Sequence, residues 1–186
     1  MKNFFAFGVF ALLVVGMAPA SSAGDAACTG ALPVGSYDNI KVTGGVCVIG
    51  PGTIVLGSID VENGSALFVN SGAIVRGSIS KKGLGSLEIF GAAIGGNVKS
   101  EDGSSFRLHN NTVRGNLELI GNNGFPQEIF ANFVGGNLKY EKNLGGVAAN
   151  ISNNRIGGNL ECKDNVLPPV GGGNTAGSKK DQCAGL

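Results

Sequence analysis

Few side chains in this 186-residue chain could take part in catalysis. His109 is the only histidine, and it follows Phe106 and Leu108 in an alternating apolar pattern that predicts an outward direction for its side chain. A histidine without a placed Asp, Ser or Cys forms neither a hydrolytic triad nor a Cys/His pair. We therefore predict that His109 is a surface residue and that the chain has no catalytic residue of this kind.

Carboxylates offer a second chemistry. Glu101 and Asp102 are adjacent, and Asp60 and Glu62 precede them by about forty residues. Clustered carboxylates can hold calcium or act as an acid/base pair on a polysaccharide. Three lysines interrupt this set along the chain, namely Lys81, Lys82 and Lys99. Because no long loop is available to build a cleft, we expect no enzyme, no metal site and no cofactor, with a polysaccharide lyase or hydrolase as the alternative.

Composition narrows the classes of partner. The chain has 33 glycines, 42% apolar residues and 15% charged residues, of which 14 are basic and 13 are acidic. A nucleic-acid binder that relies on bulk charge would show a basic excess, so we expect no nucleic-acid partner. The length suggests one domain, and glycine at this level without a three-residue period indicates a β protein rich in turns.

Residues 1–23 have the pattern of a secretory signal. Lys2 supplies the positive start, an uncharged apolar run extends from Phe4 to Met17, and small residues follow up to Ala23. The run is too short for a comfortable membrane span. We therefore expect a secreted chain, extracellular or periplasmic, with no membrane span after cleavage.

The strongest pattern is a repeat of about twenty residues, aliphatic–x–Gly–Ser/Asn–aliphatic. Six segments share it, centred on Gly57, Gly77, Gly96, Gly115, Gly136 and Gly158, so that the intervals are 20, 19, 19, 21 and 22 residues. Within each repeat apolar residues alternate at a spacing of two, which is typical of strands and not of helices.

A unit of this length holds two or three short strands and cannot bury its apolar face alone, but stacked units bury a continuous core. We therefore predict an all-β, single-domain parallel β-helix (β-solenoid), right-handed, with six to seven coils of 19–22 residues. Residues 24–53 would form an N-terminal cap and first coil, 54–163 the β-helix coils, and 164–186 a capping tail.

Particular positions of the repeat carry further expectations. We expect the anchor glycines to point inward near a corner, where a side chain has little room. Asparagines near the corners favour turns, and asparagines stacked on successive coils can hydrogen-bond as a ladder. Charged residues three positions after each anchor should stack in one column of mostly alternating sign, which indicates a solvated ion-paired face.

The four cysteines are expected to form two disulfides. Cys28 and Cys47 precede the first anchor, whereas Cys162 and Cys183 follow the last one. Since the two groups belong to opposite ends of a rod, geometry selects Cys28–Cys47 and Cys162–Cys183. The tail from Asn165 contains two prolines, which remove ladder donors, so we expect it to leave the coil and cap the last rung in a monomer.

Two phenylalanines mark a candidate binding loop. Phe125 and Phe130 lie near the turn at residues 121–124, within the two longest repeats, where a loop must protrude. Exposed aromatic rings there would support stacking on sugars. With Phe133 they could instead form a local core beneath that loop, which is the interpretation we favour.

The V-x-G-S/N-I/V/L motif at each turn, across residues 54–162, resembles the bactofilin-like parallel β-helix proteins. That resemblance implies a solenoid fold. Bactofilins are cytoplasmic polymers without disulfides, whereas this chain has a signal pattern and cysteines at both ends, so it looks closer to small secreted bacterial β-helix proteins. The sequence therefore favours an exported, non-enzymatic structural or surface-interaction module with an unknown surface or extracellular partner, for which a glycan is one candidate. The alternative is a carbohydrate-binding or polysaccharide-degrading β-helix.

Overall fold

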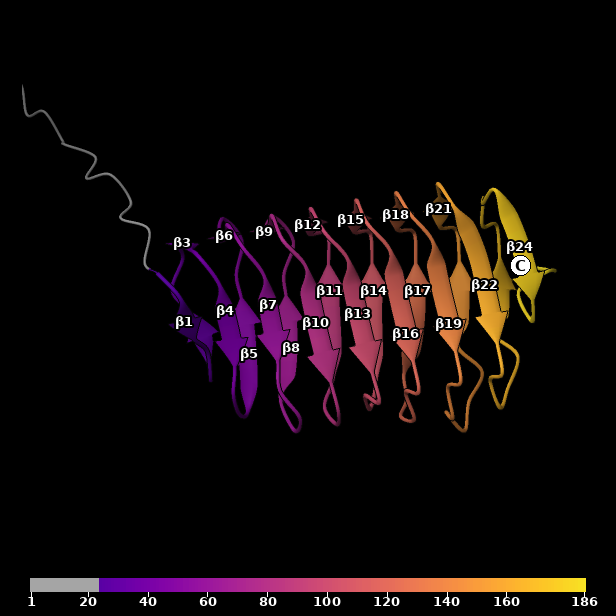
Figure 1. Cartoon of the computed structure of the whole chain (residues 1–186), viewed down its shortest axis with the longest axis horizontal. Helices are drawn as coiled ribbons and strands as arrows, with labels where there is room; N and C mark the ends of the chain where they lie inside the picture. Colours follow the sequence, from indigo (N-terminus) through magenta and orange to yellow (C-terminus); the bar gives the residue numbers. More distant parts are fainter. Residues whose placement is uncertain (1–23) are drawn as a thin grey trace, which may run out of the picture.

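The computed structural model describes residues 24–186, and the predicted signal in residues 1–23 lies outside them. Short strands coil around one axis, and successive turns stack side by side from the N-terminal end to the C-terminal end (Figure 1). All strand pairs are parallel, and three sheets result. The predicted single-domain parallel β-solenoid is confirmed.

The nine-stranded sheet collects the first strand of each turn. Its order is β1 (Ala26–Ala27), β4 (Ile40–Val42), β7 (Ile59–Val61), β10 (Ile79–Lys82), β13 (Val98–Glu101), β16 (Leu117–Ile120), β19 (Leu138–Glu141), β22 (Asn159–Lys163) and β24 (Ser178–Asp181).

The other two sheets collect the second and third strands. The eight-stranded sheet contains β2 (Ala31–Leu32), β5 (Val46–Ile49), β8 (Ala66–Val69), β11 (Leu87–Phe90), β14 (Phe106–His109), β17 (Gln127–Phe130), β20 (Asn150–Ser152) and β23 (Val170–Gly172). The seven-stranded sheet contains β3 (Ser36–Tyr37), β6 (Ile54–Val55), β9 (Ile74–Val75), β12 (Ala93–Ile94), β15 (Thr112–Val113), β18 (Phe133–Val134) and β21 (Arg155–Ile156).

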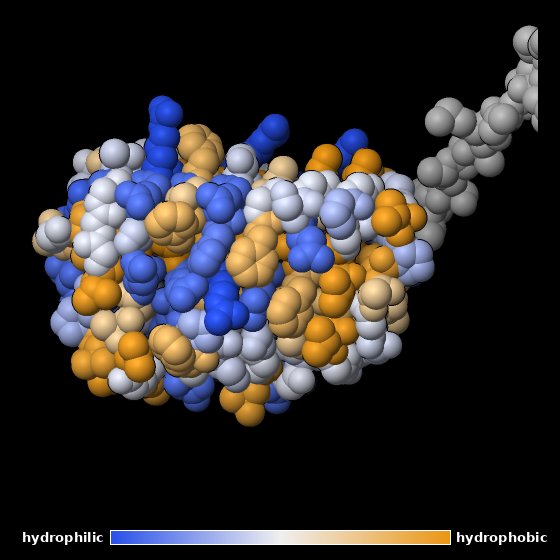
Figure 2. Space-filling view, turned by 180° about the vertical axis from the view of Figure 1, so that it is seen from behind, coloured by the Kyte–Doolittle hydropathy of each residue, from blue (hydrophilic) through white to orange (hydrophobic). Residues whose placement is uncertain are grey.

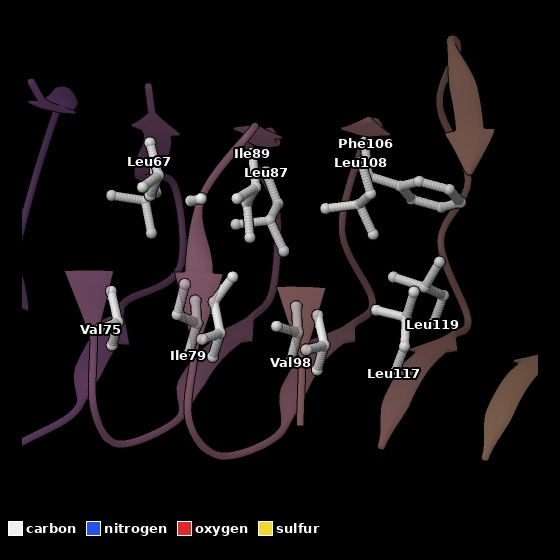
Figure 3. Packing of buried hydrophobic residues seen from close by; sticks show 14 of the residues in the cluster. Leu67, Val75, Ile79, Leu87, Ile89, Val98, Phe106, Leu108, Leu117 and Leu119 are labelled. Carbon is white, nitrogen blue, oxygen red and sulfur yellow. The ribbon is translucent and has the colours of Figure 1, made fainter. Parts of the chain in front are cut away.

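The register places equivalent residues of the repeat directly above one another. Ile94 pairs with Val75 on one side and with Val113 on the other, and all three are buried. Apolar columns from the three sheets face one another across a filled interior (Figure 3). Burial of these columns supplies the main favourable term for folding, since each turn exposes its apolar edge until the next turn covers it.

The number of turns is about eight, so the expected six to seven was too low. The tail also differs from expectation, because β23 pairs with β20 and β24 pairs with β22, both in parallel. Pro168 is exposed and Pro169 is buried, and both lie outside these strands, where the missing N–H interrupts no ladder bond. Counting anchor motifs alone missed the terminal turns because these turns lack the motif.

The anchor glycines do not point into the core, contrary to expectation. They are only half-buried, and a Cβ on Gly77 would lie 2.6 Å from the carbonyl carbon of Gly57 in the preceding turn. A Cβ on Gly115 would likewise lie 2.8 Å from the carbonyl oxygen of Gly96. Glycine is therefore required because backbones of successive turns approach closely along the axis.

Stacked amides connect the turns at the corners, as the sequence suggested. Asn111 donates hydrogen bonds from its backbone N–H and its side-chain amide to Oδ1 of Asn132, and Asn132 does the same to Asn154. A second buried ladder occupies another corner, formed by Asn122, Asn143, Asn165 and Gln182. A third follows the anchors and is formed by Asn39, Ser58, Ser78, Asn97, Asn116, Asn137 and Asn159.

Both predicted disulfides are present. Cys28 and Cys47 join the first two turns with a Cα–Cα distance of 5.4 Å, and Cys162 and Cys183 join the last turns at 5.2 Å. All four cysteines are buried, so each disulfide also fills the core at its end of the solenoid. Disulfides persist in oxidising surroundings, which indicates a non-reducing environment for this chain.

Candidate functional site

Three of the four carboxylates singled out in the sequence meet at one cavity. It has a volume of about 610 Å³ on the outer surface of the nine-stranded sheet. Asp60 and Glu62 come from the turn that contains β7, and Asp102 follows β13 two turns further on. Asn63, Ser80 and Lys82 complete its polar lining. The parallel stacking of turns thus brings together acids that are about forty residues apart.

Glu101 of the expected cluster and Lys81, one of the lysines expected to interrupt it, lie elsewhere. Glu101 pairs with Lys99 on its own strand, where Nζ and Oε1 are 2.7 Å apart. This contact raises the pKa of Lys99 above its ordinary value, through a hydrogen bond and the charge of Glu101. Lys81 turns into the core and is only 1% exposed, so it does not interrupt the carboxylates on the surface.

The acidic cavity has residue types that bind polar ligands. No group of three His, Cys, Asp or Glu side chains within residues 24–186 is placed to hold a metal ion. Glu62 is held by Lys41 at 2.8 Å, and this hydrogen bond and charge raise the pKa of Lys41. Carboxylates flanked by lysines can accept hydrogen bonds from hydroxyl groups, as a sugar-binding groove would require.

Lys81 is an unexpected feature of the interior. Its column in the nine-stranded sheet continues to Val61 and Ser100, and its amine donates to the carbonyl oxygen of Gly83. Burial lowers the pKa of Lys81 to about 8, because desolvation disfavours the charged ammonium. With Ser100 and the nearby Asn122, it occupies the corner where the second amide ladder ends. No substrate can reach this buried amine, so it is a structural donor.

His109 lies on the outer face of the eight-stranded sheet, as alternation predicted. Its ring makes edge contacts with Phe90 and Phe130, with ring centroids 5.4 and 5.9 Å away. Nε2 lies 3.0 Å from Oε2 of Glu128, but the N–H direction is not aligned for a hydrogen bond. Arg107 lies between Glu88 and Glu128 at 3.4 and 3.7 Å. These aromatic and ion-paired side chains form a partly exposed strip on the outer face of the eight-stranded sheet.

The structure places the candidate loop residues at the surface. Phe125 is 65% exposed in the loop before β17, and Phe130 is 39% exposed at the end of that strand. Phe133 is 41% exposed on the neighbouring sheet, with the Arg155 guanidinium 5.8 Å above its ring centre. The three rings therefore do not form the buried local core that the sequence analysis favoured.

Sequence reasoning missed a second hollow, of about 480 Å³, on the outer surface of the seven-stranded sheet. Gly95 lies between Arg76 and Arg114 there, with Ile74 and Thr112 also in its lining. The signal was available, because both arginines immediately precede an anchor glycine, in alternate repeats. These arginines precede the anchors, whereas the charged columns predicted from the sequence follow them.

The columns after the anchors stack as predicted. Lys99 pairs in register with Glu118, Glu118 with Lys139, and Lys139 with Glu161.

In the view of Figure 2, hydrophilic side chains cover the middle of the molecule, and hydrophobic ones gather nearer the N-terminal end. In residues 24–186 no helix is long and apolar enough to cross a membrane.

Comparison with known proteins identifies no relative of this chain. No protein-family model, no curated protein and no solved structure matches the chain. The functional proposal therefore rests on the chemistry of the protein surface.

Proposed function

We propose that this chain is an exported, non-enzymatic β-solenoid that serves as a structural or surface-interaction module. The observation that carries the proposal is that covalent bonds fix both ends of the rod and hydrogen bonds fix its turns. Each end has a disulfide buried in the core, and ladders of asparagine amides connect the turns between them. A scaffold fixed in this way holds its outer faces in constant register, which suits repeated contacts with an extended partner.

Export is supported by three features. The disulfides require a non-reducing compartment, residues 1–23 have a signal pattern, and the described chain adds no membrane-spanning helix. The expected product is a capped monomer outside the cytoplasm, because each disulfide ties the terminal turn to its neighbour and so holds the edge strands in place.

The acidic cavity and the exposed aromatic residues favour carbohydrate as a second candidate ligand class. Asp60, Glu62 and Asp102 could accept hydrogen bonds from sugar hydroxyls, and Phe125 and Phe130 offer exposed rings for stacking. A polysaccharide-degrading enzyme would need a carboxylic acid and a carboxylate at a defined separation across a bound chain. The lysine pairing of Glu62 and Glu101 favours binding over such catalysis.

The proposal is tested by expressing the full chain, with its own N-terminus, in a bacterium that has a periplasm. We expect fully oxidised protein outside the cytoplasm, and cosedimentation of the purified protein with cell-envelope fragments. A panel of acidic and neutral polysaccharides should show no release of reducing ends during prolonged incubation. Release that depends on Asp102, measured with Asp102→Asn as the comparison, would overturn the non-enzymatic assignment. Retention of the chain in the cytoplasm would overturn export.

A further inference from the structure

One outer face of the solenoid, formed by β6 to β21 of the seven-stranded sheet, is positively charged without acidic residues. These strands and their flanking turns span 50–58, 70–78, 91–97, 110–116, 131–137 and 153–159, which contain no Asp or Glu, whereas the first strand of the sheet, β3, is followed by Asp38. They contain three of the four arginines of the chain, Arg76, Arg114 and Arg155, and no lysine. All three are exposed, and none has a carboxylate within 4.0 Å in residues 24–186. We call these three arginines, with Ile74, Thr112 and Phe133, the arginine face.

The register fixes the geometry of this face. Gly95 donates its N–H to the carbonyl of Val75 at 2.7 Å, and Arg114 donates to Ile94 at 2.9 Å, so positions 76, 95 and 114 occupy three consecutive turns. At about 4.8 Å per turn, Arg76 and Arg114 are about 10 Å apart along the axis. Gly95 leaves the floor of the 480 Å³ hollow open between them. A Cβ at Gly95 would lie 3.0 Å from the carbonyl carbon of Arg76, so no larger residue fits there.

The face combines charge with apolar surface. Ile74 and Phe133 are 42% and 41% exposed, and the Arg155 guanidinium lies over the Phe133 ring. Guanidinium groups bind carboxylates through two parallel hydrogen bonds, and exposed apolar side chains can pack against the C–H faces of sugar rings. Hydrophilic side chains project from the upper edge of the molecule in Figure 2, the edge at which Figure 1 places β9, β15 and β18.

We propose that the arginine face binds a single chain of carboxylated polysaccharide, laid along the solenoid axis with its carboxylates on Arg76 and Arg114. This inference rests on the proposed surface-interaction role and names its ligand class. A polymer is required because one small anion cannot bridge arginines two turns apart. Each strand of this face is two residues long, about 7 Å, which suits one narrow chain.

The test measures binding of the oxidised, exported protein to polygalacturonate by titration calorimetry. The double variant Arg76→Gln/Arg114→Gln should weaken binding at least tenfold. The matched control Lys139→Gln/Lys163→Gln removes two positive charges from the nine-stranded sheet and should bind within twofold of the unmodified protein. Raising the salt concentration should weaken binding of the unmodified protein, since exposed charges are screened. Circular dichroism and thermal melting confirm that each variant is folded.

Neutral pullulan and poly-L-glutamate distinguish the ligand classes. We expect no binding of pullulan and at least tenfold weaker binding of poly-L-glutamate. Equal affinity for poly-L-glutamate would overturn the polysaccharide assignment, and equal losses in the two double variants would overturn the site. If polygalacturonate does not bind while envelope cosedimentation persists, this inference fails and the proposed surface-interaction role stands. If neither occurs, both fail.

Discussion

Asn111 and Asn132 lie one above the other in adjacent turns, and Oδ1 of Asn132 accepts hydrogen bonds from both the backbone N–H and the side-chain amide of Asn111, each at 3.0 Å. The amide of Asn132 in turn donates to the carbonyl of Leu108 and to Oδ1 of Asn154. Each amide thus satisfies buried backbone groups that the corner removes from the strand ladders.

Replacing Asn132 with alanine should therefore be strongly destabilising. The change leaves the Asn111 N–H and the Leu108 carbonyl without these partners, and each unsatisfied buried group costs about 1–3 kcal/mol. We expect the free energy of unfolding to fall by about 3 kcal/mol, measured by urea denaturation. Asn123→Ala is the matched control, because Asn123 is exposed; a loss of comparable size in both variants would contradict the ladder's role.

Two glycines should respond to alanine in opposite directions. In Gly77→Ala the new methyl group would contact the backbone of Gly57, which cannot move without disturbing the preceding turn, so we expect a loss of about 2 kcal/mol or more. In Gly50→Ala nothing lies within 4 Å of the new methyl group, and φ at that position is not left-handed. The unfolded chain then loses freedom, so stability should rise by about 0.5 kcal/mol. Equal melting temperatures would refute the close-approach explanation.

The buried Lys81 should lower stability at neutral pH. Its pKa of about 8 lies below its ordinary value of 10.5, so the folded state holds the charged form at a cost of about 3 kcal/mol at pH 7. Lys81→Met fills similar volume without a charge but loses the hydrogen bond to Gly83. We expect a net gain of about 1–2 kcal/mol at pH 7 in urea denaturation, whereas Lys82→Met, on the outer face, should change stability by less than about 0.5 kcal/mol.

The pH dependence of the free energy of unfolding should follow from Lys81 and from Tyr140. Between pH 8 and 10.5 the unfolded chain binds more protons at Lys81 than the folded chain, so stability should rise with pH across this window. Burial raises the pKa of Tyr140 above its ordinary value of 10.0, so stability should fall again above about pH 10. The Lys81→Met variant should lose the rise and keep the fall. A rise of unchanged size in this variant would exclude Lys81 as its source.

Removal of the C-terminal disulfide should weaken that end of the rod. The Cys162–Cys183 bond closes a loop of 21 residues, for which the loop-entropy model gives about 3 kcal/mol. In Cys162→Ala/Cys183→Ala we expect this loss, together with concentration-dependent association in size-exclusion chromatography as the edge of β22 becomes accessible. Cys28→Ala/Cys47→Ala is the matched variant at the other end. Unchanged melting and elution would refute the capping role.

The repeat made most of the fold predictable. The spacing of the anchors gave the register that pairs Ile94 with Val75 and Val113, and the positions of the cysteines relative to the repeats gave both disulfides. A periodic sequence has few alternative registers, because a slip of one residue would turn each apolar column toward solvent.

The structural features that could not be predicted from the sequence involve residues that depart from the twenty-residue repeat. Lys81 has the inward parity of its strand, but its charge suggested a surface residue, and only the polar corner shows why burial is tolerated. The turns at both ends lack the anchor motif, and the prolines of the tail lie outside β23 and β24. The arginine face was missed because its charges occur in alternate turns and become neighbours only across Gly95.

The ligand should bind on the arginine face and not in the acidic cavity. Hydrogen–deuterium exchange of the oxidised protein, with and without polygalacturonate, distinguishes the two surfaces. We predict slower exchange confined to peptides covering residues 74–78, 93–97 and 112–116. Slower exchange instead at residues 60–63 and 101–103, around the acidic cavity, or no change at saturating polymer, would contradict it.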